Sequence, residues 1–278
     1  MLRRIKQSPA PLNVLNYKKE ARMIFDSPSL KRFYKTTPIT FLIALAVTIM
    51  FGVTILTGGF TSSNLLRLGA LFTPSVYLEG DYYRLFTVMF LHGSVSHYIF
   101  NTLFGLVIIS ATLERLIGSW RFSLLYFGSG ILASLTIYGL FLLNQQPTLG
   151  VGASGAIYGV LGAFLFITYK RPEWFSRTDT TSIRGLIIIN IIFTIIVPNI
   201  SVAAHLGGLA AGFLLSYLLT PKNRPSRGAR AGFANPYQDE YDPFNRPDPF
   251  DDDDPFKNIE DVTIVDDDDP EDPWGRYS

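Results

Sequence analysis

Six apolar blocks, separated by short polar stretches, constrain this 278-residue chain more than any other feature. The blocks are residues 38–57, 93–113, 120–143, 154–169, 183–198 and 202–220. A helix needs roughly 20 apolar residues to cross a bilayer, and the blocks reach or approach that length, the fourth and fifth being the shortest. One short block could be a buried helix of a soluble protein, but six in one chain argue against that interpretation. We therefore predict an all-α integral membrane protein with six transmembrane helices.

Positive charges lie almost entirely on one side of this predicted topology. Of the 24 Lys and Arg residues, only Arg67 and Arg84 fall in outward segments. The other 22 lie in the segments 1–37, 114–121, 170–184 and 221–278. This asymmetry follows the positive-inside rule and places both ends of the chain in the cytoplasm. The chain has no cysteine, which excludes disulfides and thiolate chemistry.

The two ends of the chain differ in composition from the apolar blocks. Residues 1–37 carry nine basic side chains without a signal-peptide core, and we expect a cytoplasmic segment that either lies on anionic lipid or is a solvated tail. Residues 221–278 begin basic and turn acidic, a composition that cannot bury enough apolar surface to order itself. We therefore divide the chain into 1–37, 38–220 and 221–278.

The acidic tail repeats Asp-Pro-Phe at a six-residue step, starting at Asp242, Asp248 and Asp254. Recurrent aromatic residues in such a tail could dock a cytoplasmic partner. A solvated tail is the preferred interpretation, and a docking segment is the alternative.

The longest outward connection, residues 58–91, is too apolar for a hydrated loop. Its tyrosines have polar tips, which suit the boundary between lipid and water. We expect this segment to lie partly in the outer leaflet beside the helices, with Arg84 as an interfacial cation next to Tyr83.

Polar residues also gather in the second apolar block. His97 and Asn101 are four residues apart at its outer end, so they share one helical face. Donors at that depth favour a functional site, and a polar pair that bonds to a neighbouring helix is the alternative. At the inner end, Arg115 suits a helix C-terminus but Glu114 does not. We expect Glu114 to have a local basic partner and a structural role.

The fourth block opens with Gly150-Val151-Gly152-Ala153-Ser154-Gly155. The glycines allow close approach of another backbone, and the start of a helix leaves free N–H groups near the Ser154 hydroxyl. Ser154 is therefore a candidate nucleophile with part of an oxyanion site beside it. Gly and Ser also open membrane helices simply for packing or capping, which is the alternative interpretation.

Small residues on two blocks predict a close helix contact. Gly155 and Gly159 form a face on the fourth block, and Gly208 and Gly212 continue a stripe that begins at His205 on the sixth. If the two faces meet, the serine and the histidine at their outer ends come together.

The predicted topology gives three polar residues a common depth. Blocks two, four and six all run from outside to inside, and His97, Ser154 and His205 lie near their outer ends. This set suits serine acyl transfer, with His205 as base and with His97, Asn101 and backbone N–H groups as oxyanion donors worth roughly 3 kcal/mol each. The outward segments hold only two carboxylates and none is placed to orient His205, so we expect a dyad and not a triad.

These residues resemble the rhomboid intramembrane serine proteases. The matching motifs, in chain order, are Tyr83-Arg84, His97-xxx-Asn101, Glu114-Arg115-xx-Gly118, Gly152-Ala153-Ser154-Gly155 and Ala204-His205-xx-Gly208-xxx-Gly212. The resemblance covers residues 38–220 and implies a six-helix bundle with an interfacial first outward loop. Tyr83 stands where members often carry Trp, and the resemblance says nothing of the long acidic tail.

The resemblance also implies roles for individual residues. Ser154 is the nucleophile, His205 is the base on which Tyr158 stacks, and His97 and Asn101 belong to the oxyanion site. We expect supporting backbone roles for Gly152, Gly155 and Gly208. The implied reaction is cleavage of transmembrane proteins near the outer membrane face, without cofactor or metal, after a small residue and close to helix-breaking residues.

We expect single-pass or multi-pass membrane proteins as substrates, the lipid bilayer as surroundings, and no nucleic acid as partner. The charge asymmetry and the absence of a transit peptide favour a bacterial cell membrane. A catalytically inactive rhomboid-like membrane chaperone or binding protein is the alternative function. A hydrolase of the α/β type is excluded because Ala156 stands where Gly-x-Ser-x-Gly needs its last glycine. A transporter is disfavoured because there is no inverted repeat of interrupted helices and no membrane-embedded carboxylate for coupling.

Overall fold

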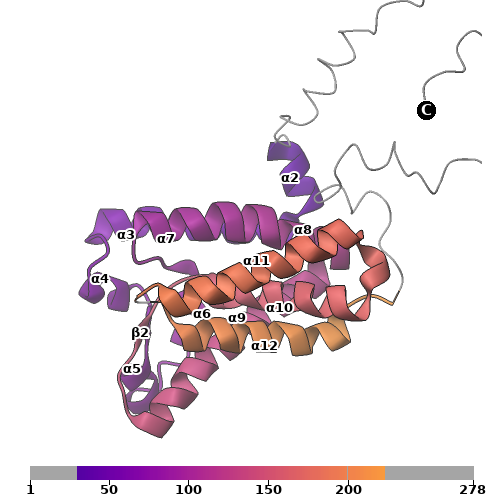
Figure 1. The fold of residues 1–278 in the computed structure, drawn as a ribbon. Coiled ribbons are helices and arrows are strands. Elements are labelled where there is room, and N and C mark those ends of the chain that lie inside the picture. The colour runs from indigo at the N-terminus through magenta and orange to yellow at the C-terminus, as the bar shows by residue number, and fades with distance from the viewer. Residues whose placement is uncertain (1–29, 199, 223–278) are drawn as a thin grey trace, which may run out of the picture. The chain divides into compact units, whose positions relative to one another are not determined.

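The computed structural model describes residues 30–198 and 200–222. Most of the predicted basic N-terminal segment and nearly all of the predicted acidic tail, including its Asp-Pro-Phe repeats, lie outside these described residues. The described part is helical apart from two paired strands of two residues each, which confirms the predicted all-α class (Figure 1).

The elements follow one another as a series of long helices with a group of short helices after the first. The helices are α2 (Leu30–Thr36), α3 (Pro38–Thr57), α4 (Ser62–Arg67), α5 (Thr73–Leu78), α6 (Arg84–Thr87), η1 (Val88–Phe90), α7 (Val95–Ile99), η2 (Phe100–Ser110), α8 (Ala111–Ile117), α9 (Ser119–Asn144), α10 (Ser154–Lys170), η3 (Pro172–Trp174), α11 (Arg177–Ile196) and α12 (Val202–Leu219). The strands are β1 (Leu71–Phe72) and β2 (Leu149–Gly150). The segments α7, η2 and α8 form one continuous helical stretch in which η2 has π-helical hydrogen bonding.

Five helical segments of the described chain are long and apolar enough to cross a membrane: α3, the stretch from α7 to α8, α9, α11 and α12. The helix α10 is also apolar but has only 17 residues. Its place in the fold explains its length. It packs against α9, α12 and η2, and most of its residues are buried by protein. The sixth membrane span therefore stays a prediction for α10.

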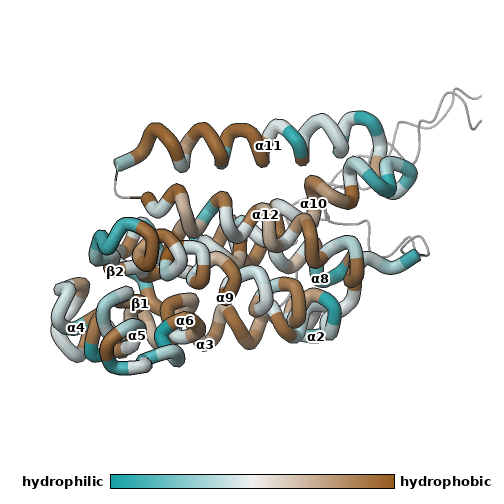
Figure 2. The backbone as a smooth tube through the Cα atoms, turned by 90° about the horizontal axis from the view of Figure 1, so that it is seen from below, coloured by the Kyte–Doolittle hydropathy of each residue, from teal (hydrophilic) through white to brown (hydrophobic). Residues whose placement is uncertain are grey.

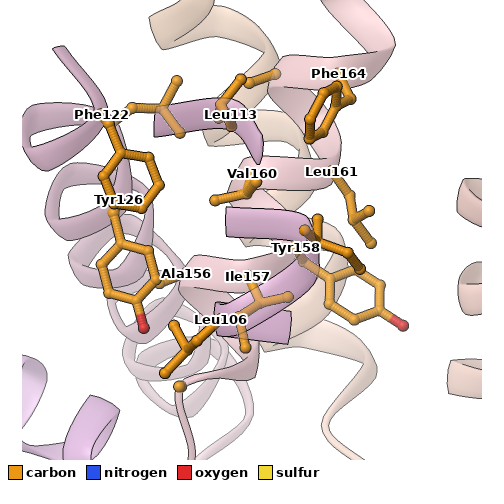
Figure 3. Close-up of a cluster of buried hydrophobic side chains, with 14 of the residues drawn as sticks. Leu106, Leu113, Phe122, Tyr126, Ala156, Ile157, Tyr158, Val160, Leu161 and Phe164 are labelled. Atoms are coloured by element: carbon orange, nitrogen blue, oxygen red, sulfur yellow. The ribbon is translucent and has the colours of Figure 1, made fainter. Parts of the chain in front are cut away.

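The core of the molecule is built around α10. Figure 3 shows its side chains interleaved with those of η2, α8 and α9. The labelled members of this cluster are Leu106, Leu113, Phe122, Tyr126, Ala156, Ile157, Tyr158, Val160, Leu161 and Phe164. Because lipid offers no hydrophobic driving force between helices, dense packing of this kind is what holds the bundle together.

The helix α11 begins six residues earlier than the predicted start at residue 183. Ser176 is its N-cap and forms a capping box with Asp179, in which each side chain bonds to the backbone of the other. The first turns of α11 are polar, so hydropathy did not reveal where the helix begins. The spacing of Ser176 and Asp179 is the usual sequence signature of a capped helix N-terminus. Figure 2 shows these polar turns in teal at one end of an otherwise brown helix.

Glu114 at the inner end of α8 is buried, with only 1% of its surface exposed. Its carboxylate accepts hydrogen bonds from the backbone N–H groups of Ile39, at 3.0 Å, and Thr40, at 2.8 Å. These groups belong to the first turn of α3, where the helix dipole favours a negative charge. These backbone bonds support the predicted structural role of Glu114, and its predicted basic partner stays a prediction.

Substituting Glu114 with Gln should lower the free energy of unfolding by about 1–3 kcal/mol. The amide removes the charge and presents an N–H₂ group close to the N–H groups of α3. A lower melting temperature in detergent would register the loss, and Glu173→Gln at an exposed position is the matched control. Equal melting temperatures for the two variants would contradict the capping role.

The segment between α3 and α7 is held together by Arg84. Its guanidinium donates to the carbonyl oxygens of Leu66, at 2.7 Å, and Ala70, at 3.0 Å, and forms an ion pair with Asp81 at 2.8 Å. It also lies over the Tyr83 ring, 5.1 Å from the centroid. Arg84 thereby fixes the start of α6 to the end of α4 and to the turns at Ala70 and Asp81. The interfacial location of this segment in a membrane stays a prediction.

Candidate active site

Ser154 is the first residue of α10, and the segment before it is anchored to the outward loop. The strand β2 pairs with β1, with Gly150 opposite Leu71. The Gly152 N–H then donates to the Val88 carbonyl at 3.0 Å. These bonds fix the segment that directly precedes Ser154. The position of Ser154 therefore depends on the segment between α3 and α7 as well as on α10.

Gly152 brings Ser154 and His97 to the same place. Its φ of +129° lies in a region that favours glycine. A Cβ at this position would lie 2.8 Å from the His97 Nε2 and 3.5 Å from the Ser154 Oγ. The absence of a side chain therefore lets the His97 imidazole sit directly against the turn that leads into α10.

His205 lies in the first turns of α12 and is mostly buried, with 7% of its surface exposed. Its ring stacks on that of Tyr158 in α10, with 3.9 Å between centroids and 15° between planes. The start of α12 is capped by Ser201, whose hydroxyl accepts the Ala204 N–H at 3.2 Å. Both the rotation and the depth of the imidazole are thus restricted.

The glycine faces of α10 and α12 meet. A Cβ at Gly208 would collide with the Gly155 carbonyl oxygen, and a Cβ at Gly212 would collide with the Gly159 carbonyl oxygen. Nearer the outer end, a Cβ at Gly155 would be 3.8 Å from the Ala204 carbonyl oxygen. The residues that directly precede Gly155 and follow Ala204 are the serine and the histidine, so this backbone contact brings them together.

His97 and Asn101 lie where α7 passes into η2. The His97 N–H bonds to the Ser94 hydroxyl, which caps α7, at 3.1 Å. The Asn101 side-chain amide donates to the His97 carbonyl at 2.9 Å. An amide NH₂ group has two hydrogens, so one remains for another acceptor. The switch from α-helical to π-helical bonding occurs at these residues, which is common at functional sites.

His92 is a buried residue beside the site to which the sequence assigned no role. Only 1% of its surface is exposed, and neither ring nitrogen has a hydrogen-bond partner among the described residues. Its ring contacts the His97 ring edge to face, with 5.0 Å between centroids, and also faces Tyr98. Burial, with a contribution from His97, lowers the pKa of His92 to about 3. The His92 ring is therefore neutral and packs as an aromatic group against the His97 ring.

The lowered pKa of His92 predicts that the folded protein loses stability in acid. The His92 pKa falls from 6.5 to about 3 on folding, so between these values the unfolded chain binds a proton that the folded chain does not. Stability should therefore decline as pH falls from 6.5 toward 3, by up to about 1.4 kcal/mol per pH unit from this residue. Melting temperatures of the parent and of His92→Phe across this range measure the effect. A parent and variant with parallel curves would contradict it.

The helix α11 contributes two polar groups that sequence reasoning missed. The Tyr158 hydroxyl donates to the Asn190 carbonyl at 2.7 Å and is also hydrogen-bonded to the Thr194 hydroxyl. Thr194 in turn lies 2.8 Å from the His205 Nδ1. Figure 3 shows the Tyr158 hydroxyl directed away from the core cluster. The available signal was the occurrence of Asn190 and Thr194, one turn apart, in an otherwise apolar run.

The arrangement has the parts needed for acyl transfer. A serine hydroxyl lies at a helix start and an imidazole is held on the neighbouring helix. A second imidazole lies against the turn before the serine, and the Asn101 amide bonds to the backbone carbonyl of that histidine. The site residues predicted from the sequence lie in α7, η2, α10 and α12, except Gly152, which lies in the turn before α10.

Comparison with known proteins gives a consistent picture. A model of the Rhomboid domain family matches residues 79–222, more than half of the chain. The chain is 36% identical over 180 residues to the rhomboid protease GluP of Bacillus subtilis, across 65% of this chain and 34% of GluP. It is 36% identical over 144 residues to the putative rhomboid protease YdcA of the same species, across 52% of this chain and 70% of YdcA. It is 35% identical over 161 residues to the RHOMBOID-like protein 1 of Arabidopsis thaliana, across 58% of this chain and 40% of that protein. The chain thus spans about a third of the length of GluP but more than two thirds of YdcA.

Proposed function

Because this chain belongs to the rhomboid family, we propose that it is an intramembrane serine endopeptidase that cuts transmembrane proteins near the outer face of the membrane. The observation that carries this proposal is the placement of His205, stacked on Tyr158 and joined to the Ser154 helix by a direct backbone contact. The multi-pass helical bundle supports the membrane setting.

In this proposal the reaction proceeds through an acyl-enzyme. The Ser154 Oγ attacks the scissile carbonyl carbon while His205 takes the hydroxyl proton. The C–N bond breaks as His205 gives that proton to the leaving amine, and the substrate acyl group stays on Ser154 as an ester. A water molecule then attacks the ester with His205 again as base, which releases the acid and restores the serine.

The negative charge of the tetrahedral intermediate needs donors that are already in place. In this proposal the donors are the His97 ring, which lies against the Gly152 turn, the Asn101 amide, which bonds to the His97 carbonyl, and the backbone N–H groups at the start of α10. Preorganised donors of this type typically contribute a factor of about 10²–10³ each to the rate. The reaction uses protein groups alone and requires no cofactor or metal.

The substrate must present an unwound segment. A peptide bond inside a membrane helix is already hydrogen-bonded and covered, so helix-breaking residues near the cut favour exposure to Ser154. We therefore propose membrane-protein substrates that carry small and helix-breaking residues at the outer end of a span. Both termini of this chain lie in the cytoplasm in this proposal, with α10 as the sixth span, and its setting is a bacterial cell membrane.

A cleavage assay on the purified full chain tests the function. The substrate is a designed transmembrane peptide with Ala and Gly near the outer end of its helix, and the control substrate has Leu at those positions. We expect one cut in the outer third of the first peptide, located by mass spectrometry, and labelling of the enzyme by a serine-directed fluorophosphonate. A chain that binds the first substrate but neither cuts it nor reacts with the fluorophosphonate is an inactive relative, and the chaperone function replaces the protease.

A further inference from the structure

Thr194 is an exception on its own helix. The helix α11 is the least covered of the five candidate membrane spans, with 17% of its apolar window buried. Its last turns expose Ile192, Phe193, Ile195 and Ile196, and Figure 2 shows this part as strongly apolar. Thr194 lies among them with only 1% of its surface exposed. A buried hydroxyl on a lipid-facing helix needs partners, and its partners are found at the proposed active site.

The Thr194 hydroxyl has three hydrogen-bonding neighbours. It donates to the Asn190 carbonyl, four residues earlier, at 2.9 Å. It lies 2.8 Å from the His205 Nδ1 and is also bonded to the Tyr158 hydroxyl. A hydroxyl has one hydrogen and two lone pairs, so only one of the three contacts can be a donation from Thr194.

The direction of the bond to His205 depends on where Thr194 sends its single hydrogen. The Asn190 carbonyl can only accept, and back-bonding to the carbonyl four residues earlier is the usual choice of a threonine inside a helix. With its hydrogen used there, Thr194 offers His205 only a lone pair. The His205 Nδ1 must then carry the hydrogen and donate it. Nε2 is left without a hydrogen, and that nitrogen is the one a base needs for the Ser154 proton.

We propose that Thr194 is a positioning residue that holds His205 in the tautomer with hydrogen on Nδ1, so that Nε2 is free to act as the base. The inference rests on the proposed protease function and deepens it: the site has a third group behind the base, which is a neutral hydroxyl from α11. Tyr158 reinforces it, because its hydroxyl bonds to both Asn190 and Thr194 while its ring stacks on His205.

The opposite tautomer would require a different set of bonds. Thr194 would have to give up its bond to the Asn190 carbonyl and donate to Nδ1. His205 would then carry its hydrogen on Nε2, where it blocks proton transfer from Ser154. In the first arrangement Thr194 donates to the Asn190 carbonyl and uses its two lone pairs to accept from the His205 Nδ1 and from the Tyr158 hydroxyl, so that each hydrogen has one acceptor.

Two substitutions at this position separate the hydroxyl from the shape of the side chain. Thr194→Val keeps the volume and removes the acceptor, which leaves the Nδ1 hydrogen unpaired in a buried site. We expect kcat to fall by about 10- to 100-fold with KM changed less than about twofold. Thr194→Ser restores the acceptor and should recover most of the activity. Thr181→Val is the matched control, because Thr181 makes the same bond to the carbonyl four residues earlier but is exposed on α11.

The tautomer itself can be read without any assay of activity. The chain has only three histidines, so nitrogen-15 NMR of histidine-labelled protein in detergent resolves the ring nitrogens, and His205→Gln identifies the His205 signals. We expect the parent and Thr194→Ser to carry the hydrogen on Nδ1, and Thr194→Val to shift toward Nε2.

Two results overturn the proposal: a parent with hydrogen on Nε2, or a Thr194→Val protein whose tautomer and kcat match those of the parent. A parent that shows the Nδ1 tautomer but cuts no substrate would refute the protease function and leave the positioning of His205 standing. The two proposals can thus fail separately.

Discussion

Ser154→Ala is expected to lower the cleavage rate by about 10⁴-fold or more, because the covalent step has no other nucleophile at this position. His205→Ala should cost nearly as much, since the serine hydroxyl then has no base. The double variant should be about as slow as Ser154→Ala alone, because residues that act as a unit lose their joint contribution when the first is removed. Rates of cleavage of the designed transmembrane substrate measure all three.

A matched serine far from the catalytic groups controls for handling and folding. Ser63 is exposed on α4, and Ser63→Ala should cut at the parental rate. Fluorophosphonate labelling should be lost in Ser154→Ala and retained in Ser63→Ala. Undiminished cleavage by Ser154→Ala would remove Ser154 from the mechanism and point to another nucleophile.

Gly208→Ala should destabilise the bundle by about 1–3 kcal/mol and reduce cleavage sharply, although it adds only a methyl group. The added carbon would collide with the Gly155 carbonyl oxygen, which is backbone and cannot rotate away. The helices α10 and α12 would have to separate, and this separation would move His205 away from Ser154. Melting temperature in detergent and cleavage rate should fall together.

Gly139 on α9 provides the control with the same substitution, because a Cβ there would meet no atom within 4 Å. Alanine has the higher helix propensity by about 1 kcal/mol, so Gly139→Ala should be neutral or stabilising. The two variants are therefore expected to differ in sign. If Gly208→Ala melts at or above the temperature of Gly139→Ala, the close contact of α10 and α12 is not required for stability.

Much of the fold could be predicted because the membrane imposes simple rules. Hydropathy located each long helix to within a few residues, apart from the start of α11, where the capping residues Ser176 and Asp179 mattered more than apolar length. The glycine spacing on the fourth and sixth blocks predicted a close contact, and the structure contains it. Small residues in a membrane helix are informative because they are the ones that let backbones approach.

The parts that sequence reasoning missed depend on contacts between distant segments. Thr194 contacts His205, and His92 contacts His97. Both contacts join segments that are not neighbours along a single helix face, so residue spacing does not predict them. The sequence indicated a structural role for Glu114. It did not reveal the hydrogen bonds from the Ile39 and Thr40 N–H groups, because every residue but proline has such a group. The catalytic roles of Ser154 and His205 remain predictions that the Ala variants test, and the oxyanion roles of His97 and Asn101 also remain predictions.

The bonds from Ile39 and Thr40 to Glu114 span 75 and 74 positions of the chain. A ribosome adds about 5–20 residues per second, so roughly 4–15 seconds pass between synthesis of the first turn of α3 and synthesis of the carboxylate that caps it. During that time two N–H groups of the first span must bond to water or to lipid headgroups. The helix that is made first is therefore fixed in its final position only after the next long helical stretch has been completed.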